Sequence, residues 1–391
     1  MVQVVYKILC IVPYIFFAST VFAQENSGRI YGTVELSNEQ KYEGRITWTD
    51  SKALWNNRFV GLDRSRTQYA PPQTQPRGFF NFGEPFDIMF GYIVSITKLD
   101  RSNIIILKDK REITAFEVDS HREGDITILD LDAGSVKVPL NELKKVKFSD
   151  EPKSYSNRID EKVYPLYGTV NTFENMSLNG YIQWGGNRNL SVHSLRITEG
   201  RDVREIAFDQ VGVVKSLGRR GYEITLLNGK KLYSRSFENR WGVIVIDKRF
   251  GRVEVNWDEI SEVAFIQNAP GIPYSDFKAG VPIRGTLIDT SGVEHTGYVR
   301  WDNHEQMTTD ELDGSISRGI TFYIEFRNIS EIKRRTYSSA IVRLKSGEEL
   351  TLRNSIDVDA HNRGIFILNK PDDKEGKVFT WNEFDRLIIK N

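Results

Sequence analysis

The stretch Ile30-Tyr31-Gly32-Thr33-Val34, followed by Gly44-Arg45-Ile46-Thr47-Trp48, decides the fold because the chain repeats it twice. The second copy is Leu166-Tyr167-Gly168-Thr169-Val170 with Gly180-Tyr181-Ile182-Gln183-Trp184, and the third is Ile283-Arg284-Gly285-Thr286-Leu287 with Gly297-Tyr298-Val299-Arg300-Trp301. The three copies align without a gap, so both glycines and the tryptophan keep their register. Internal repeats of this kind determine the architecture of a chain. The sequence therefore predicts three tandem units.

Each unit also contains a second phrase twice, in which apolar and aromatic residues are spaced by two, three and three positions. The earlier versions are Ile88, Phe90, Ile93 and Ile96; Ile206, Phe208, Val211 and Val214; and Ile324, Phe326, Ile329 and Ile332. The later versions begin at Val138, Val255 and Phe379. Each unit is therefore expected to consist of two related modules, which gives six modules in the chain.

The second module of each unit opens with alternating apolar residues around a short polar turn. Those turns are Asp109-Lys110, Asn228-Gly229 and Ser346-Gly347. Alternation with a turn that tolerates positive φ is typical of a β-hairpin. The three-residue steps, as in Trp257-Asp258-Glu259-Ile260, predict a single 3₁₀ turn. Because no segment has a sustained helical period, we expect an all-β fold.

The order of strand, turn, three strands, 3₁₀ turn and short strand resembles that of SH3-like small β-barrels, including Sm-like modules. The residues that carry the resemblance are hairpins such as Leu226-Leu227-Asn228-Gly229-Lys230-Lys231-Leu232 and closing phrases such as Val255-Asn256-Trp257-Asp258-Glu259-Ile260. The resemblance implies two SH3-like barrel modules in each unit, and it implies a ligand-binding or assembly scaffold. A six-bladed β-propeller is the alternative fold, because six four-stranded modules also suit it.

The N-terminus has the pattern of a cleaved signal peptide. Lys7 precedes an apolar run from Ile8 to Phe22, which ends at the small residue Ala23. This run contains Pro13 and is shorter than the roughly 20 apolar residues of a membrane span. The expected division is a signal peptide at 1–23, unit 1 at 24–152 with an insertion at about 51–85, unit 2 at 153–269 and unit 3 at 270–391. The mature chain is expected to be periplasmic or secreted, with no membrane span after cleavage.

Charge and cysteine content narrow the class of partner. The chain has 53 basic and 53 acidic residues, and its one cysteine, Cys10, lies in the expected signal peptide. A neutral chain has no long-range field to attract nucleic acid. An exported chain of this size without cysteine is stabilised by ordinary hydrophobic cores rather than by disulfides. We expect protein or glycan partners and no nucleic acid.

The sequence predicts no catalytic residue, no metal site and no cofactor. His304-Glu305-Gln306-Met307-Thr308 lacks the second histidine of a helical zinc motif and follows an expected strand. Asp130-Leu131-Asp132-Ala133-Gly134 begins like a calcium loop, but its glycine comes one position early and no glutamate stands at the twelfth position. A solvated hairpin turn accounts for the latter stretch.

Aromatic residues that fall outside the repeat are the candidates for partner binding. Trp48 and Ile88 are 40 positions apart, whereas the matching residues of the other units are 22 and 23 apart, so unit 1 carries an insertion. Exposed aromatics in such a loop indicate packing or binding. The candidates are Trp55, Tyr69, Phe79, Phe80, Phe82 and Trp241. The repeated tryptophans Trp48, Trp184 and Trp301 are expected in the core rather than as platforms for sugar rings.

The leading functional hypothesis is a non-enzymatic scaffold of the cell envelope that binds protein or glycan partners. Repetition without a cluster of titratable groups favours it, because catalysis normally needs one asymmetric arrangement. One alternative is a hydrolase that acts on envelope polymers through carboxylates such as Asp302 or Asp310. Another is a subunit of a structural assembly.

Export predicts a defined mature N-terminus. We expect the protein recovered from the envelope or the medium to begin at Gln24, because signal peptidases cleave after a small residue. Intact-mass measurement checks this expectation. A recovered species that retains residues 1–23 would contradict it.

Overall fold

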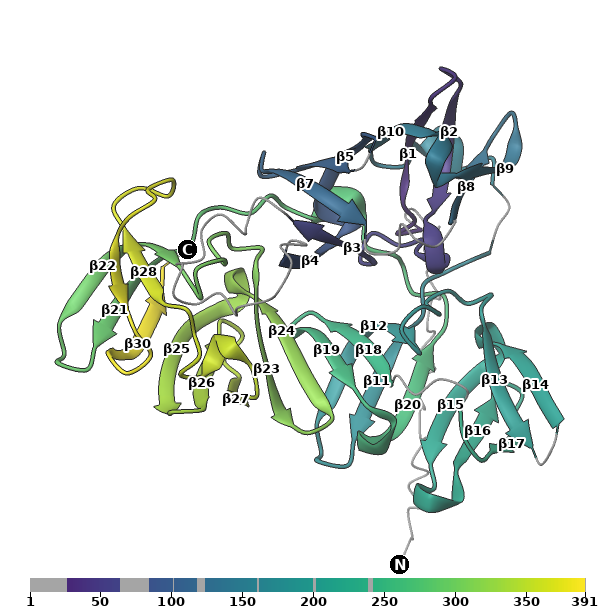
Figure 1. Ribbon diagram of the computed structural model, residues 1–391. Helices are drawn as coiled ribbons and strands as arrows, with labels where there is room; N and C mark the ends of the chain where they lie inside the picture. Colours follow the sequence, from purple (N-terminus) through teal and green to yellow (C-terminus); the bar gives the residue numbers. More distant parts are fainter. Residues whose placement is uncertain are drawn as a thin grey trace, which may run out of the picture.

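The computed structural model describes residues 27–63, 84–100, 102–117, 124–159, 162–199, 202–237 and 242–390. These residues form an all-β structure in which every strand pairing is antiparallel. For description, residues 27–152 are called the first segment, residues 153–269 the second segment and residues 270–390 the third segment. Figure 1 shows the first segment in purple and blue, the second in teal and the third in green and yellow. The expected signal peptide lies outside the described residues.

Ten strands are described in each segment. Those of the first segment are β1 (Tyr31–Leu36), β2 (Lys41–Thr47), β3 (Arg58–Asp63), β4 (Glu84–Met89), β5 (Ile93–Lys98), β6 (Asn103–Leu107), β7 (Glu112–Glu117), β8 (Asp125–Asp130), β9 (Gly134–Pro139) and β10 (Leu143–Phe148). Those of the second are β11 (Tyr167–Thr172), β12 (Ser177–Trp184), β13 (Ser194–Glu199), β14 (Asp202–Ala207), β15 (Val211–Ser216), β16 (Tyr222–Leu226), β17 (Lys231–Ser234), β18 (Val243–Asp247), β19 (Gly251–Val255) and β20 (Ile260–Ile266). Those of the third are β21 (Arg284–Asp289), β22 (Glu294–Arg300), β23 (Glu311–Ser317), β24 (Ile320–Glu325), β25 (Ile329–Thr336), β26 (Ser339–Leu344), β27 (Glu349–Arg353), β28 (Ile365–Leu368), β29 (Lys377–Phe379) and β30 (Phe384–Ile389).

The helical elements are single turns. One α-helical turn, α1 (Lys153–Ser156), follows β10. The 3₁₀ turns are η1 (Thr49–Ser51), η3 (Phe90–Tyr92), η5 (Leu140–Glu142), η6 (Phe208–Gln210), η7 (Gly218–Arg220), η8 (Trp257–Glu259), η9 (Tyr274–Asp276), η10 (Phe326–Asn328) and η11 (Ile356–Val358). The expected 3₁₀ turn at Trp257 is confirmed, and so is the hairpin around Asn228-Gly229, which joins β16 to β17.

The repeated glycines occupy positions where a side chain has no room. Gly168 on β11 lies opposite Gly180 on β12. A Cβ atom on Gly168 would lie 2.1 Å from the carbonyl oxygen of Ala264 on β20, and one on Gly180 would lie 2.0 Å from that of Ile246 on β18. The corresponding pairs, Gly32 with Gly44 and Gly285 with Gly297, also face each other across a strand pair. Glycine is required here because neighbouring backbone approaches so closely.

The repeated tryptophans lie in the cores, as predicted. Trp48, Trp184 and Trp301 are each at most 3 % exposed. Trp184 packs against Trp257 with ring centroids 4.6 Å apart, and the indole N–H of Trp301 donates to the carbonyl oxygen of Asp357 at 3.0 Å. A buried indole that is satisfied in this way stabilises a core through both its area and its hydrogen bond.

The expectation of closed barrels is wrong, because no sheet among the described residues closes on itself. β10 uses one edge to pair with β1 and the other to pair with β5. β20 and β30 likewise each join two halves of a segment. A strand has only two edges, so a strand shared between halves leaves neither half able to close. The strands form sheets of ten, eighteen and two members rather than the six separate sheets of a propeller.

The second and third segments are joined by backbone hydrogen bonding. β19 pairs with β24, with Arg252 opposite Tyr323 and Val255 opposite Ile320. Phe250 packs on Phe322 next to this pairing, with ring centroids 5.7 Å apart. Figure 1 shows the two strands side by side, with the first segment above them. The eighteen-stranded sheet therefore runs through both segments.

Among the residues that the structure describes, no helix has the length and apolar character needed to cross a membrane.

Because neighbouring backbone lies so close to the paired glycines, one added methyl group is expected to lower the stability of the fold strongly. We expect Gly180→Ala to lower the free energy of unfolding by about 2–4 kcal/mol, because the added Cβ overlaps the Ile246 carbonyl. The matched control is Gly212→Ala on β15, where the nearest atom would lie 3.3 Å from the added Cβ. Urea unfolding of both variants checks this. Equal effects of the two substitutions would contradict the steric explanation.

Candidate binding cavity where the three segments meet

A cavity of about 630 Å³ lies where the three segments meet. Its floor is one face of three paired strands, β19, β24 and β23, on which Arg252, Tyr323 and Asp313 lie in one row. Residues of the first segment form the facing wall. The charged lining residues are Arg58, Asp87, Lys108, Asp109, Arg111, Arg252, Glu254, Glu305, Asp310, Glu311 and Asp313. The volume is within the range of small-molecule and peptide sites.

A buried group of charges connects all three segments at the cavity. Arg58 on β3 donates to both carboxylate oxygens of Glu311 on β23, at 2.8 and 2.9 Å. Asp87 on β4 contacts Arg58 and lies 3.5 Å from Arg252 on β19. Burial lowers the pKa of Arg58, while Glu311 acts in the opposite direction. A two-point guanidinium–carboxylate pair fixes orientation as well as distance.

Arg252 is held by contacts on several sides. Its guanidinium lies 3.5 Å from the ring centroid of Tyr323, which is a cation–π geometry. It also forms a 2.6 Å ion pair with Glu254, whose side chain is 40 % exposed. The second segment therefore contributes to the cavity a guanidinium that stacks on an aromatic ring of the third segment, and a partly accessible carboxylate.

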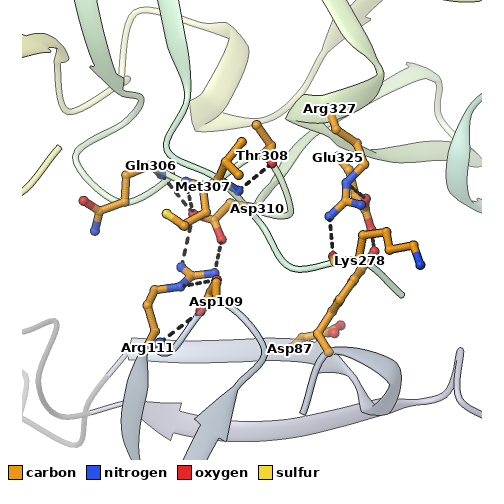
Figure 2. Close-up of polar contacts among 12 residues, drawn as sticks. Asp87, Asp109, Arg111, Lys278, Gln306, Met307, Thr308, Asp310, Glu325 and Arg327 are labelled. Atoms are coloured by element: carbon orange, nitrogen blue, oxygen red, sulfur yellow. Dashed lines mark hydrogen bonds and ion pairs between the residues drawn. The ribbon is translucent and has the colours of Figure 1, made fainter. Parts of the chain in front are cut away.

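A second ion-pair network joins the first and third segments, as Figure 2 shows. Arg111 donates to Asp109 at 2.9 Å and to Asp310 at 3.0 Å. Asp310 also accepts the backbone N–H groups of Gln306 and Met307, each at 2.9 Å. The carboxylate of Asp310 is thus held both by its own loop and by the facing segment.

Glu325 forms the third polar contact between these segments. It accepts the phenol proton of Tyr92 at 2.5 Å. It also lies 2.8 Å from Arg327, and Figure 2 shows Glu325 and Arg327 on the side away from Arg111. Glu311 stands directly opposite Glu325 across β23 and β24. Burial raises the pKa of Glu325 to about 7, and Glu311 adds to this, while Arg327 and Tyr92 act in the opposite direction.

The residues that precede β21 also attach the third segment to the first. Lys108 donates to the carbonyl oxygens of Tyr274 and Phe277, at 2.6 and 3.0 Å. Tyr274 donates to the carbonyl oxygen of Ile93 at 2.8 Å. Tyr274 and Phe277 belong to the hydrophobic core of the first segment. Apolar packing therefore accompanies the ion pairs at this junction.

Trp55 lies at the same contact. It is 2 % exposed and packs against Tyr274 with ring centroids 4.5 Å apart. The aromatic surface predicted at Trp55 is therefore covered by the third segment of the same chain. The remaining predicted partner-binding residues, which lie outside the described residues, are Tyr69, Phe79, Phe80, Phe82 and Trp241.

The two carboxylates named for a hydrolase are both engaged in ion pairs. Asp302 is fully buried and binds Arg363, with an N–O distance of 2.9 Å to the Nε atom. Asp310 is held by Arg111 and by two backbone N–H groups. Of the two, only Asp310 lines the cavity.

Asp302, Glu305 and Asp357 form an acidic group whose ligand atoms lie within 4.8 Å of one another. Oxygen ligands at this spacing are suited to a hard cation. Burial, followed by the charges of Glu305 and Asp313, raises the pKa of Asp357 well above its usual value. The ion pair of Asp302 with Arg363 offsets part of the repulsion within the group.

The charged residues of the cavity have no distinguishing pattern in the sequence. Arg252 alternates with apolar residues along its strand, and Arg58 and Asp87 are single charges beside apolar residues. Solvent-facing charges occur in strands in the same way. Only pairing between distant strands reveals that they face one another. A comparison of segments offers a partial signal, because Asp87 and Tyr323 each stand just before the shared Ile-x-Phe phrase and both line the cavity.

The raised pKa of Glu325 predicts a pH-dependent stability. The folded state keeps a proton that the unfolded chain loses near its ordinary pKa of 4.5, so this contribution is complete below pH 4.5 and is lost as the pH rises through about 7. We expect Glu325→Gln to remove about 3 kcal/mol of the difference in unfolding free energy between pH 4.5 and 7.5. Urea unfolding at both pH values checks this, with Glu174→Gln at an exposed turn as the matched control. A pH difference equal to that of the wild type would contradict it.

The chain matches no protein-family model and no curated protein. No solved structure matches it either. Its function is therefore inferred from the chemistry of the described residues.

Proposed function

We propose that this chain is an exported, non-enzymatic β-repeat scaffold of the cell envelope, periplasmic or secreted, that binds a protein or glycan partner. The observation that carries the proposal is the cavity, since all three segments contribute residues to it. A site that exists only when three parts of a chain are assembled is suited to holding a ligand between them. The engaged carboxylates favour binding over hydrolysis.

The strand orders support a tandem repeat. In the first segment the order is β4-β3-β7-β6-β5-β10-β1-β2-β8-β9, and in the third it is β24-β23-β27-β26-β25-β30-β21-β22-β28-β29. In the second segment β17-β16-β15-β20-β11-β12-β18-β19 follows the same order, while β13 and β14 form a sheet of their own. Three copies of one two-part unit account for this correspondence.

The course of each half also supports the SH3-like interpretation. In the second segment, β15 to β17 form a meander, and β18 and β19 lead through the 3₁₀ turn η8 into β20. That course follows the order of SH3-like modules, although the shared strand β20 leaves both halves open. We therefore propose SH3-like modules that are fused through their last strand rather than six independent barrels.

Filling the cavity tests the proposed function. Ala279 lines the cavity and is exposed, so Ala279→Trp adds bulk there without removing a charge. Ala133→Trp, at an exposed turn between β8 and β9, is the matched control. We expect Ala279→Trp to lower capture of the partner from an envelope extract, or binding on a glycan array, at least tenfold, and the control to leave it unchanged.

Two outcomes would overturn the proposal. One is the absence of any specific partner in both screens with the wild-type protein. The other is turnover of an envelope polymer that is abolished by Asp310→Asn, which would establish the hydrolase alternative. Circular dichroism and thermal unfolding of each variant show whether its fold is retained.

A further inference from the structure

The cavity carries an excess of acidic groups, although the chain as a whole does not. Seven acidic and four basic side chains line it, whereas the full sequence has 53 of each kind. A concave, partly buried site concentrates the field of such an excess. The excess of acidic side chains in the cavity therefore favours a positively charged ligand.

The basic groups of the cavity are already neutralised by neighbours. Arg58 is held by Glu311 and Asp87, and Arg111 is held by Asp109 and Asp310. Both guanidinium groups are at most 25 % exposed. An incoming anion would have to displace one of these carboxylates, at the cost of leaving a buried charge without its partner.

The other two cations are engaged in the same way. Arg252 stacks on Tyr323 and pairs with Glu254, and Lys108 donates to two backbone carbonyl groups. Burial lowers the pKa of Lys108 to about 8. The cations thus act as part of the wall rather than as receptors for an anion.

The floor presents three carboxylates in a regular array, and two of them, Glu311 and Glu254, also pair with arginines. Glu311 and Asp313 are two positions apart on β23, so they lie on the same face of the sheet. Asp313 stands across β24 from Arg252, and Glu254 is two positions further along β19. Asp313 is half-buried and the Glu254 side chain is 40 % exposed, so both carboxylates border the open space.

We infer that the cavity binds a ligand through a cationic ammonium or guanidinium group, held between Asp313 and Glu254 on its floor. A lysine or arginine side chain of a peptide supplies this chemistry, as does a small polyamine. Charge-assisted hydrogen bonds to carboxylates are about twice as strong as neutral ones. The inference rests on the proposed function, because it names the chemistry of the partner for the same cavity.

Titration calorimetry of the mature protein tests the inference with four probes. They are acetyl-Gly-Lys-Gly-Lys-Gly-amide, the same peptide with norleucine in place of lysine, spermidine, and the neutral disaccharide diacetylchitobiose. We expect the lysine peptide to bind at least tenfold more tightly than the norleucine peptide, and this preference to decrease between 20 and 300 mM salt, as screening predicts. Spermidine binding equal to that of the lysine peptide identifies a free amine as sufficient.

Charge-removing variants locate the site. Asp313→Asn and Glu254→Gln should each weaken binding of the lysine peptide about tenfold. Asp372→Asn and Glu294→Gln, both at exposed positions of the third segment, are the matched controls and should leave it unchanged. Equal binding of the lysine and norleucine peptides, or binding of diacetylchitobiose alone, would overturn the inference.

The two proposals fail in different ways. If Ala279→Trp abolishes capture of an envelope partner while no cationic probe binds, the proposed function stands and the cationic ligand is wrong. If cationic probes bind at Asp313 and Glu254 while no envelope partner exists, the ligand chemistry stands and the proposed function is wrong. Thermal unfolding of Asp313→Asn confirms that its fold is retained before binding is compared.

Discussion

The buried pair of Arg58 and Glu311 constrains the arrangement of the whole chain. A guanidinium and a carboxylate that leave water lose several kcal/mol of solvation each, and only close contact between them recovers it. The two residues are 253 positions apart in the sequence, and Asp87 and Arg252 complete their surroundings. In the observed position of the first segment relative to β23, each of these charges has an oppositely charged partner. Apolar contacts of Tyr274 and Phe277 with the core of the first segment favour the same arrangement of the segments.

Local features of the fold can be predicted from the sequence because neighbouring residues determine them. The hairpin at Asn228-Gly229 and the 3₁₀ turn at Trp257 need only a few residues of sequence. The paired glycines are visible as a repeat, and the structure supplies the reason in the carbonyl groups that face them. The predicted closure of the barrels is wrong, since the sequence does not show that β10, β20 and β30 each give both of their edges to pairing.

The candidate site is beyond the reach of sequence patterns for a different physical reason. Its members come from strands whose proximity depends on the β19–β24 pairing, and a charge on an alternating strand has the same pattern whether it faces water or another segment. Trp55 is instructive in this respect. It has no equivalent in the other units, and it packs against Tyr274 of the third segment. A residue that departs from a repeat marks a place where something unique packs, and here that is the chain itself.

The β19–β24 pairing has a mechanical consequence. It joins the second and third segments through a backbone ladder, whereas side chains and the residues around Tyr274 attach the first segment to them. A ladder loaded along its strands must lose several hydrogen bonds at once, but side-chain ion pairs separate one after another. Under tension the second and third segments would therefore stay joined, while the first segment would separate from them at a lower force. The cavity lies at this weaker contact.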